Sequence, residues 1–224
     1  MTPHRVALYW APEVGDPLHA LGSRWLGRDA VANAAVAQPD VAEIAEITAE
    51  PCVYGLHATL KPPFRLTGAY EAVRDGALAV AARTAPFELP PLSVQDLHGF
   101  LALRENYPCP ALHLFADDCV EAVDAYRVPP DEAELARRRP ERLSEAQRVL
   151  LARWGYPYVF EEWRFHVTLT RRLTPEEKAR VLPAVTAFLG DAPAQHRRVE
   201  SLCIFVQAAP GAPFTLAERL PLQG

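Results

Sequence analysis

Two short segments of the chain share one pattern, apolar–His–apolar–Thr–Leu. They are residues 56–60 (LHATL) and residues 165–169 (FHVTL), which align without gaps. Side chains of a β-strand point alternately to its two faces. His57 and Thr59 would therefore share one face of a strand, and the three apolar residues around them would share the other. The repeat predicts two strands of this kind, each with one face in a core and one polar face lining a cleft.

The polar faces of the two segments suit the cleavage of a phosphodiester. Opening a 2′,3′-cyclic phosphate requires a base for the attacking water and an acid for the leaving oxygen. Two histidines flanking one phosphorus can fill both roles, one neutral and one protonated near pH 7. Threonine hydroxyls can donate to the non-bridging oxygens as charge develops there. We therefore predict that His57 and His166 are catalytic and that Thr59 and Thr168 bind phosphate, with no metal or other cofactor.

The remaining elements are predicted from caps, prolines and periodicity. Strands are expected at 5–10, 54–60 (ended by the prolines at 62 and 63), within 87–103, and at 111–115, 163–170, 199–207 and 214–221. Helices are expected at 16–25, 70–85, from 117–118 to 126, at about 131–139, at 144–154 and at 174–189, with 29–49 as a further candidate.

The order of these elements is similar in the two halves of the chain. A His-bearing strand, a helix and two strands occur in each half, which indicates an internal duplication of elements. We therefore expect an α+β fold with two pseudo-symmetric lobes, each an antiparallel sheet with helices, around a central cleft. The lobes would comprise about 1–115 and 157–224, with a more helical insertion at about 116–156. The sequence leaves open whether this insertion acts as a lid.

The composition of the chain limits the classes of molecule that it is expected to bind. The net charge of -5 disfavours binding to long nucleic acid, which depends on Lys and Arg neutralising phosphates. No apolar stretch approaches the ~20 residues that span a membrane. The four cysteines form no C-x-x-C pair and the first residues resemble no signal peptide, so we expect free thiols and a cytoplasmic location. The expected partner is a small phosphate ester or nucleotide, and the oligomeric state is left open.

Two basic residues share the spacing of the polar faces. Lys61 follows Thr59 by two positions, and Arg164 precedes His166 by two. If the strands extend that far, both cations would face the phosphate and neutralise part of its charge. A solvated position at a strand end explains each of them equally well.

Aromatic residues supply further candidates. Tyr9 and Trp10 would point to opposite faces of the first strand, so one would enter the core and the other could stack on a base or sugar. The alternative, which the sequence favours, is core packing for both rings. Tyr156 lies in a Gly- and Pro-containing turn before the second His strand and could reach over the cleft. The run Arg137–Arg139 is typical of a solvated helix end, and the alternative is a clamp for a distal phosphate.

The paired His-x-Thr-x tetrads resemble those of the 2H phosphoesterase superfamily. Longer strings resemble a narrower branch, uncharacterised bacterial proteins assigned to phosphonate metabolism; they are YWAP (9–12), GSRWLGRD (22–29), HATLKPPF (57–64), ELARRRP (134–140), WGYPY (154–158) and FHVTLT (165–170). The resemblance implies a bilobal fold, catalytic His57 and His166, and phosphate-binding Thr59 and Thr168. It also implies a link to phosphonate breakdown, which passes through ribosyl cyclic phosphates.

Residues and resemblance together predict a metal-independent 2H phosphoesterase, a phosphoric diester hydrolase. Its substrate would be a cyclic phosphodiester of a small nucleotide or ribosyl phosphate. The alternative is a module that binds a nucleotide or an RNA-end phosphate without turnover.

Overall fold

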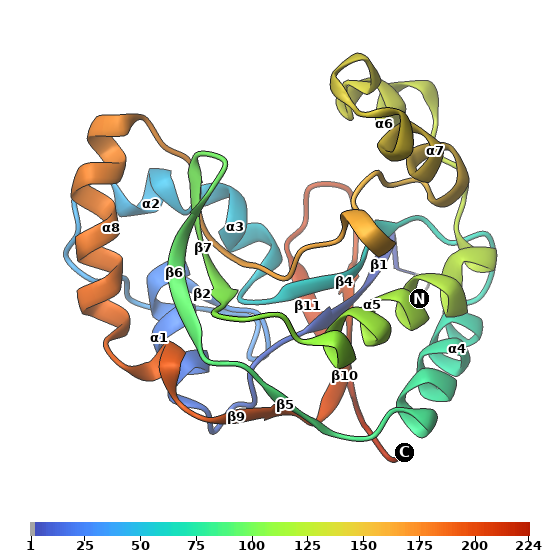
Figure 1. Ribbon diagram of the computed structural model, residues 1–224, viewed down its shortest axis with the longest axis horizontal. Helices are drawn as coiled ribbons and strands as arrows, with labels where there is room; N and C mark the ends of the chain where they lie inside the picture. Colours follow the sequence, from blue (N-terminus) through green and yellow to red (C-terminus); the bar gives the residue numbers. More distant parts are fainter. Residues whose placement is uncertain (1–2) are drawn as a thin grey trace.

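The computed structural model describes residues 3–224, whose strands pair antiparallel and are covered by helices (Figure 1), so the α+β class is confirmed. The main sheet has seven strands in the order β11-β10-β1-β4-β8-β7-β6. Their bounds are β1 Arg5–Trp10, β4 Ala58–Phe64, β6 Leu92–Leu97, β7 Phe100–Glu105, β8 Val167–Arg172, β10 Ser201–Gln207 and β11 Phe214–Pro221. Two small sheets pair β2 (Arg28–Asp29) with β3 (Ala34–Ala35) and β5 (Phe87–Leu89) with β9 (Arg197–Val199).

Three helices begin at the caps that the sequence predicts. The side chains of Asp16, Ser144 and Thr174 each accept a backbone N–H from the first turn of the following helix. The helices are α1 Pro17–Leu26, α2 Ile44–Ile47, α3 Ala49–Tyr54, α4 Tyr70–Arg83, α5 Pro110–Val123, α6 Glu132–Arg137, α7 Glu145–Trp154 and α8 Pro175–Leu189.

The main sheet consists of two strand groups that meet at the two His-Thr segments. One group is β11, β10, β1 and β4, and the other is β8, β7 and β6. β4 and β8 are joined at the single register pair Ala58↔Val167, whereas β1 and β10 pair over five residues. Beyond this pair, no register pair joins β4 and β8 in the described part of the chain. The polar residues that flank Ala58 and Val167 therefore lie next to one another at the place where the sheet opens.

The two strand groups do not coincide with the predicted chain halves 1–115 and 157–224. The late strands β10 and β11 join β1 and β4, whereas the early strands β6 and β7 join β8. Each half of the chain thus contributes strands to both groups. Local sequence cannot reveal this exchange, because pairing between distant strands is decided by tertiary packing.

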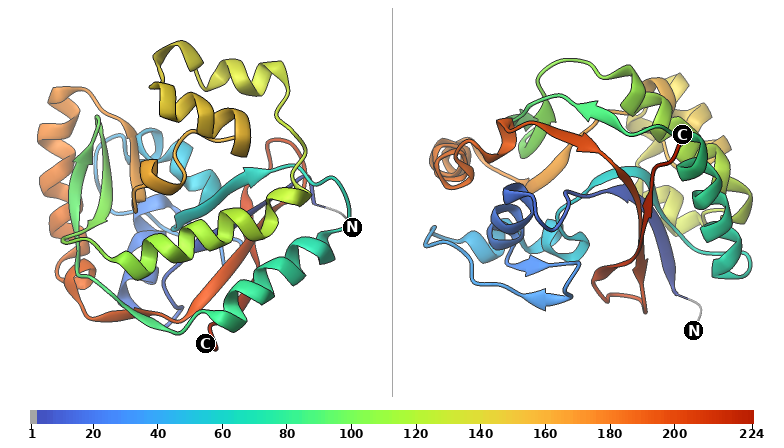
Figure 2. Two further views of the ribbon diagram at one scale, coloured as in Figure 1. Left: turned by 45° about the vertical axis from the view of Figure 1, so that its right-hand side comes forward. Right: turned by 90° about the horizontal axis from the view of Figure 1, so that it is seen from below.

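Helices cover the two strand groups differently. α4 and α5 lie side by side over β4, β10 and β11 (Figure 2), whereas α1, α3 and α8 pack near β6 and β8. α6 and α7 project above the sheet (Figure 1); α6 buries no residue and α7 buries only Leu151. The predicted insertion is therefore shorter than 116–156, because α5 belongs to the packed body.

The core confirms the alternation expected for the first strand and both His-Thr segments. On β1, Leu8 and Trp10 enter the large core, whereas Tyr9 joins a smaller apolar cluster on the opposite face. In both His-Thr segments the apolar positions are buried and the His and Thr positions are half-buried. The apolar residues Leu56, Ala58, Leu60, Phe165, Val167 and Leu169 all lie in the large core.

Residues 111–115 are helical, and the prediction of a strand there is wrong. Pro110 occupies the first turn of α5. The buried residues Leu112, Phe115, Cys119 and Val123 recur at helical spacing on one face. This pattern extends over 14 residues, so a window limited to 111–115 misses it. Asp117 and Asp118 consequently lie inside the helix and do not cap it.

Three other boundaries differ from the prediction. Residues 29–49 contain a β-hairpin of β2 and β3, and their helix is limited to α2 and the first residue of α3. Tyr54 ends α3, and β4 starts at Ala58 and continues through Pro62 and Pro63. The prolines fit because β4 pairs with β8 only at Ala58, which leaves that edge open beyond it. β8 likewise starts at 167 rather than at 163.

Within residues 3–224, helices long and apolar enough to cross a lipid bilayer are absent.

Candidate active site

His57 is fixed by the turn that ends α3. Gly55 closes this helix with φ 78° and ψ -178°. Its carbonyl oxygen lies 2.9 Å from Nδ1 of His57, so Nδ1 donates to it. Nε2 is then the nitrogen that can take up or release a proton, and it lies 3.2 Å from Oγ1 of Thr59. The hydrogen bond sets both the tautomer and the orientation of the ring.

The turn before His57 tolerates only glycine. A Cβ built on Gly55 would lie 2.3 Å from the Cβ of Ala30, and the positive φ disfavours any L side chain. The close approach holds the carbonyl of Gly55 under the imidazole. Gly55 therefore contributes to the site through its backbone.

Aromatic rings surround His57. Its imidazole stacks on the ring of Tyr9 with centroids 3.8 Å apart, and the rings of Tyr54 and Phe205 lie within 6.4 Å. Burial, and to a smaller extent the nearby His166, lower the pKa of His57 to about 4, against the opposing effect of the hydrogen bond to Gly55. His57 is therefore neutral near pH 7.

His166 repeats the same arrangement in the second segment. Its Nδ1 lies 2.8 Å from the carbonyl oxygen of Arg164, two residues earlier, as Gly55 is two residues before His57. The ring meets Phe100 edge-on, with centroids 5.9 Å apart. Burial, and then the cationic Arg104, lower the pKa of His166 below its ordinary value. Both histidines thus present Nε2 in a mainly neutral ring.

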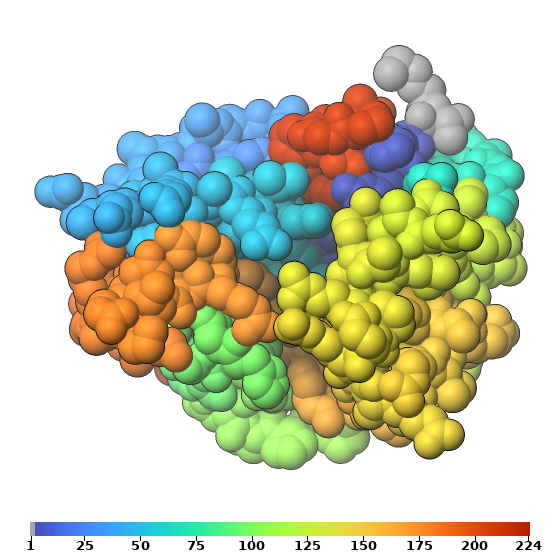
Figure 3. Space-filling model, turned by 90° about the horizontal axis from the view of Figure 1, so that it is seen from above, coloured from blue at the N-terminus to red at the C-terminus, as the bar shows by residue number. Residues whose placement is uncertain are grey.

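The two histidines line adjoining cavities. His57 and Thr168 line a cavity of about 340 Å³, and His166 lines one of about 530 Å³. The cavities share Thr59, Pro62, Phe100, Tyr156 and Arg172. We call their union the cleft. Figure 3 shows the face on which the segments around α3, after β8 and of α6–α7 surround a depression.

Two tryptophan indoles hold the His-Thr segments in place. Nε1 of Trp163 donates to the carbonyl oxygen of Thr59 at 2.8 Å, and Nε1 of Trp25 donates to that of Leu169 at 3.0 Å. Trp163 precedes the second segment and binds the first. This bond therefore fixes the distance between the two segments.

Lys61 does not face the cleft, and the prediction that it shares the face of Thr59 is wrong. The register with β1 shifts between Tyr9↔Thr59 and Leu8↔Lys61, because a bulge inserts one extra residue into β4. Lys61 is 1% exposed, lines neither cavity and lies 2.8 Å from Asp124. A bulge of one residue reverses the face of every later side chain.

The other secondary candidates lie along the cleft. Tyr9 lines the smaller cavity beneath His57, and Tyr156 lines both cavities with the guanidinium of Arg138 over its ring at 4.7 Å. Arg164 lines the larger cavity with His166, and its guanidinium donates to the carbonyl oxygens of Glu161 and Trp163. Their roles toward a substrate remain predictions, as do those of the two His-Thr pairs.

Several cleft residues escaped the sequence reasoning. Arg5, Glu50 and Arg171 line the smaller cavity, and Phe100 and Arg172 line both. The alternation of side chains along a strand could have identified two of these residues, because positions four apart share a face. Arg5 precedes Tyr9 by four positions, and Arg172 follows Thr168 by four. Phe100 and Glu50 come from other elements and carry no such signal.

Candidate metal ligands are not grouped in the described part of the chain. Among residues 3–224, no set of three or more His, Cys, Asp or Glu is placed to hold a metal ion.

Solved structures resemble this chain weakly. E. coli LigT complexed with 3'-AMP is 15% identical over 100% of both chains, with a TM-score of 0.48. A structure described as a phosphoesterase is 14% identical over 99% of both chains, with a TM-score of 0.46.

Two curated relatives match in sequence. Ribose 1,5-bisphosphate phosphokinase PhnN of Janthinobacterium sp. (strain Marseille) is 37% identical over 98% of this chain and 51% of its own length. The protein of the same name from Laribacter hongkongensis (strain HLHK9) is 39% identical over 95% of this chain and 50% of its own length. The chain therefore spans about half the length of these relatives.

A family model matches residues 59–215, which include the whole second His-Thr segment and the last two residues of the first, Thr59 and Leu60. The family is described only as a protein of unknown function. Residues 59–215 are well over half of the chain, and the longer motif strings predicted an uncharacterised family of this kind. The chain therefore belongs to the DUF1045 family, proteins of unknown function.

Proposed function

We propose that this protein is a metal-independent phosphoesterase that opens a cyclic phosphodiester of a small nucleotide or ribosyl phosphate. The observation that carries the proposal is the matched presentation of two histidines. Each donates Nδ1–H to the carbonyl oxygen two residues earlier and keeps Nε2 for proton transfer. Each is followed, two residues later, by a threonine that lines the cleft.

The reaction uses these four side chains as follows. One histidine takes a proton from water, whose oxygen forms a new bond to phosphorus. The bond from phosphorus to one ring ester oxygen breaks, and the other histidine gives that oxygen a proton. The hydroxyls of Thr59 and Thr168 donate to the non-bridging oxygens during the transfer. The product is a phosphomonoester with a neighbouring free hydroxyl.

We assign the roles of base and acid from the surroundings of the two histidines. The pKa of His57 is lowered to about 4, which favours the neutral ring required of the base. His166 is then the acid. Its pKa is also lowered in the free protein, so the negative charge of a bound phosphate would have to raise it. This division predicts that substrate binding changes the protonation of His166 and leaves His57 neutral.

The names of the curated relatives support the substrate class but not the reaction. They name ribose 1,5-bisphosphate, a phosphorylated ribose, and a kinase activity. The kinase pattern Gly-x-x-x-x-Gly-Lys-[Ser/Thr], which cradles nucleotide phosphates, does not occur in this sequence. We therefore assign the proposed activity from the histidines and not from the kinase name.

The test is a substrate screen with matched inactive variants. We expect purified protein to hydrolyse at least one of the 2′,3′-cyclic nucleotides or ribose cyclic phosphates. His57→Ala and His166→Ala should each lower kcat by about 10²–10⁴-fold while circular dichroism remains unchanged. EDTA should have no effect. Loss of activity in EDTA that zinc restores would contradict the metal-independent mechanism.

The same screen separates the alternative function. A module that binds a nucleotide or RNA-end phosphate without turnover would show saturable binding of a 3′-phosphorylated nucleotide and no product after long incubation. In that case neither the wild-type protein nor the His57→Ala variant would hydrolyse any substrate in the screen.

A further inference from the structure

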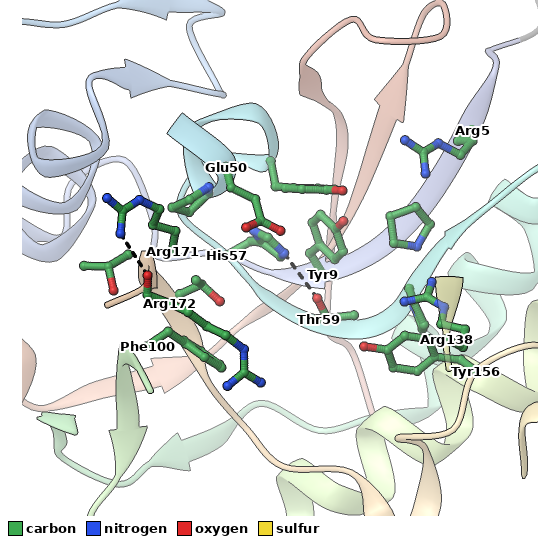
Figure 4. A pocket seen from close by; sticks show the side chains of 16 residues that line it. Arg5, Tyr9, Glu50, His57, Thr59, Phe100, Arg138, Tyr156, Arg171 and Arg172 are labelled. Atoms are coloured by element: carbon green, nitrogen blue, oxygen red, sulfur yellow. Dashed lines mark hydrogen bonds between the residues drawn. The ribbon is translucent and has the colours of Figure 1, made fainter. Parts of the chain in front are cut away.

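The smaller cavity carries five charged side chains, four arginines and one carboxylate. Figure 4 shows them on two sides of Tyr9: Glu50, Arg171 and Arg172 lie on the side of His57, and Arg5 and Arg138 lie on the other. We call these the Arg171 end and the Arg5 end. The scissile phosphate, held by His57 and Thr59, would lie between them.

The charges at the Arg171 end already have protein partners or an acidic neighbour. Arg171 forms ion pairs with Glu46 and Glu177 at 2.8 and 2.9 Å. Arg172 donates to the carbonyl oxygen of His98. The carboxylate of Glu50 lines the same end and would repel an anion. This end is therefore poorly suited to a second negative group.

The arginines at the Arg5 end have no carboxylate partner among the described residues. Arg5 uses Nε to bind Gln207 at 2.7 Å, and its guanidinium lies over the ring of Phe214. Its two Nη atoms make no hydrogen bond within residues 3–224. The guanidinium of Arg138 lies over the ring of Tyr156 and makes no hydrogen bond or ion pair within residues 3–224. Both guanidinium groups thus remain available to an anion in the cavity.

A buried hydroxyl without a partner lies in the same cavity. Tyr9 is 0% exposed, and its OH makes no hydrogen bond in the described part of the chain. A buried polar group without a partner is costly and rare in native proteins. Burial raises the pKa of this phenol well above its ordinary value, so the group keeps its proton and can donate. Arg5, Arg138 and Tyr156 line the same cavity as Tyr9.

We propose that Arg5, Arg138 and the hydroxyl of Tyr9 form a subsite for a second phosphate group of the substrate. Two guanidinium groups match the double negative charge of a phosphomonoester, and Arg binds phosphate through paired N–H donors. The substrate would then be a cyclic phosphodiester that carries a phosphomonoester elsewhere on its sugar. The substrate part of this inference rests on the proposed function, whereas the subsite itself can be tested by binding alone.

The kinetic test compares two substrates that differ by one phosphate, adenosine 2′,3′-cyclic phosphate and its 5′-phosphorylated form. We expect the wild-type protein to prefer the second at least tenfold in kcat/KM. Arg5→Gln and Arg138→Gln should each reduce this preference about tenfold, mainly through KM, because each removes charge-assisted hydrogen bonds. Activity on the first substrate should change little. Equal loss on both substrates would overturn the subsite.

Arg137→Gln is the matched control. Arg137 is the exposed neighbour of Arg138 in the same basic run and lines neither cavity. The substitution removes the same charge, so it reproduces any effect of net charge alone. If it reduces the preference as much as Arg138→Gln does, the effect is long-range electrostatics and the proposal is wrong.

A binding measurement keeps the subsite testable if no cyclic phosphate is hydrolysed. Calorimetry would compare adenosine 3′,5′-bisphosphate with adenosine 3′-monophosphate. Tighter binding of the bisphosphate that Arg5→Gln abolishes would support the subsite, even though the proposed hydrolysis had failed. Equal binding of the two nucleotides to wild-type protein would overturn the subsite, whatever the enzyme hydrolyses.

Tyr9→Phe provides an independent readout. It keeps the ring that stacks on His57 and removes only the hydroxyl without a partner. We expect the free protein to melt about 3 °C higher and the 5′-phosphate preference to fall. A lower melting temperature would show that the hydroxyl has a structural partner in the free protein, which would exclude it from the subsite.

Discussion

The two His-Thr segments share a local design but differ in their surroundings. In each segment the histidine directly precedes its strand, donates Nδ1–H two residues back and alternates with buried apolar residues. His57 lies face to face on Tyr9, between apolar rings. His166 meets Phe100 edge-on and lies near the cationic Arg104.

Both rings are mainly neutral in the free protein, and we propose that their surroundings give them different roles once a phosphate is bound. The shared hydrogen bond gives both rings the same tautomer. Their protonation is then set by the surroundings, and burial lowers the pKa of His57 to about 4. We propose that the neighbours of His57 favour its role as the base. The following predictions, from the largest effect to the smallest, test this difference.

The pH dependence of kcat/KM should assign the two roles. We expect a bell-shaped profile with its acidic limb near pH 4, from His57, and a maximum below pH 6.5, because the pKa of His166 is also lowered. His57→Gln and His166→Gln should each reduce kcat by about 10²–10⁴-fold. The first should remove the acidic limb and the second the alkaline limb. If the limbs are lost in the opposite order, the roles are reversed.

Gly55→Ala should break the equivalence of the segments by displacing one carbonyl. The new Cβ would meet Ala30 at 2.3 Å and force an L side chain into a positive φ. We expect a loss of about 3 kcal/mol in the free energy of unfolding, measured by urea denaturation. Gly68→Ala is the control, since its Cβ would meet nothing within 4 Å. Equal losses for the two variants would refute the role given to the Gly55 turn.

The low pKa of His57 should appear in the pH dependence of stability. The unfolded chain binds this proton near pH 6.5, whereas the folded chain binds it only near pH 4. The stabilisation of the folded chain that depends on neutral His57 is therefore complete above pH 6.5 and is lost as the pH falls toward 4. Between pH 7 and 4.5, wild type should lose about 2 kcal/mol more than His57→Gln. Parallel stability curves would contradict the lowered pKa.

Much of the local structure could be predicted from the sequence. The alternation around His57 and His166, the opposite faces of Tyr9 and Trp10, and the caps at Ser144 and Thr174 all follow from short-range geometry. These features depend on the period of a strand or on the first turn of a helix. Both are fixed by residues within a few positions of one another.

Other features depend on residues that are distant in sequence. The bulge that turns Lys61 toward Asp124 is visible only in the pairing of β4 with β1. The exchange of β10 and β11 into the group of β1 is likewise a matter of strand pairing. The wrong strand at 111–115 has a different origin, because the helical spacing of α5 is present in the sequence and becomes clear only over its 14 residues. The bulge and the strand exchange depend on pairing between distant strands, which local sequence does not specify.

By itself, the sequence determined that the chain carries two His-Thr faces of one design, because side-chain alternation on a strand requires nothing beyond the neighbouring residues. Only the tertiary structure decided that the two faces share a cleft, that His57 lies on Tyr9 and that Arg5 and Arg138 line the same cavity. The physical reason is that pKa values and charge clusters depend on which residues the folded chain brings together, and this depends on strand pairing across the whole sheet.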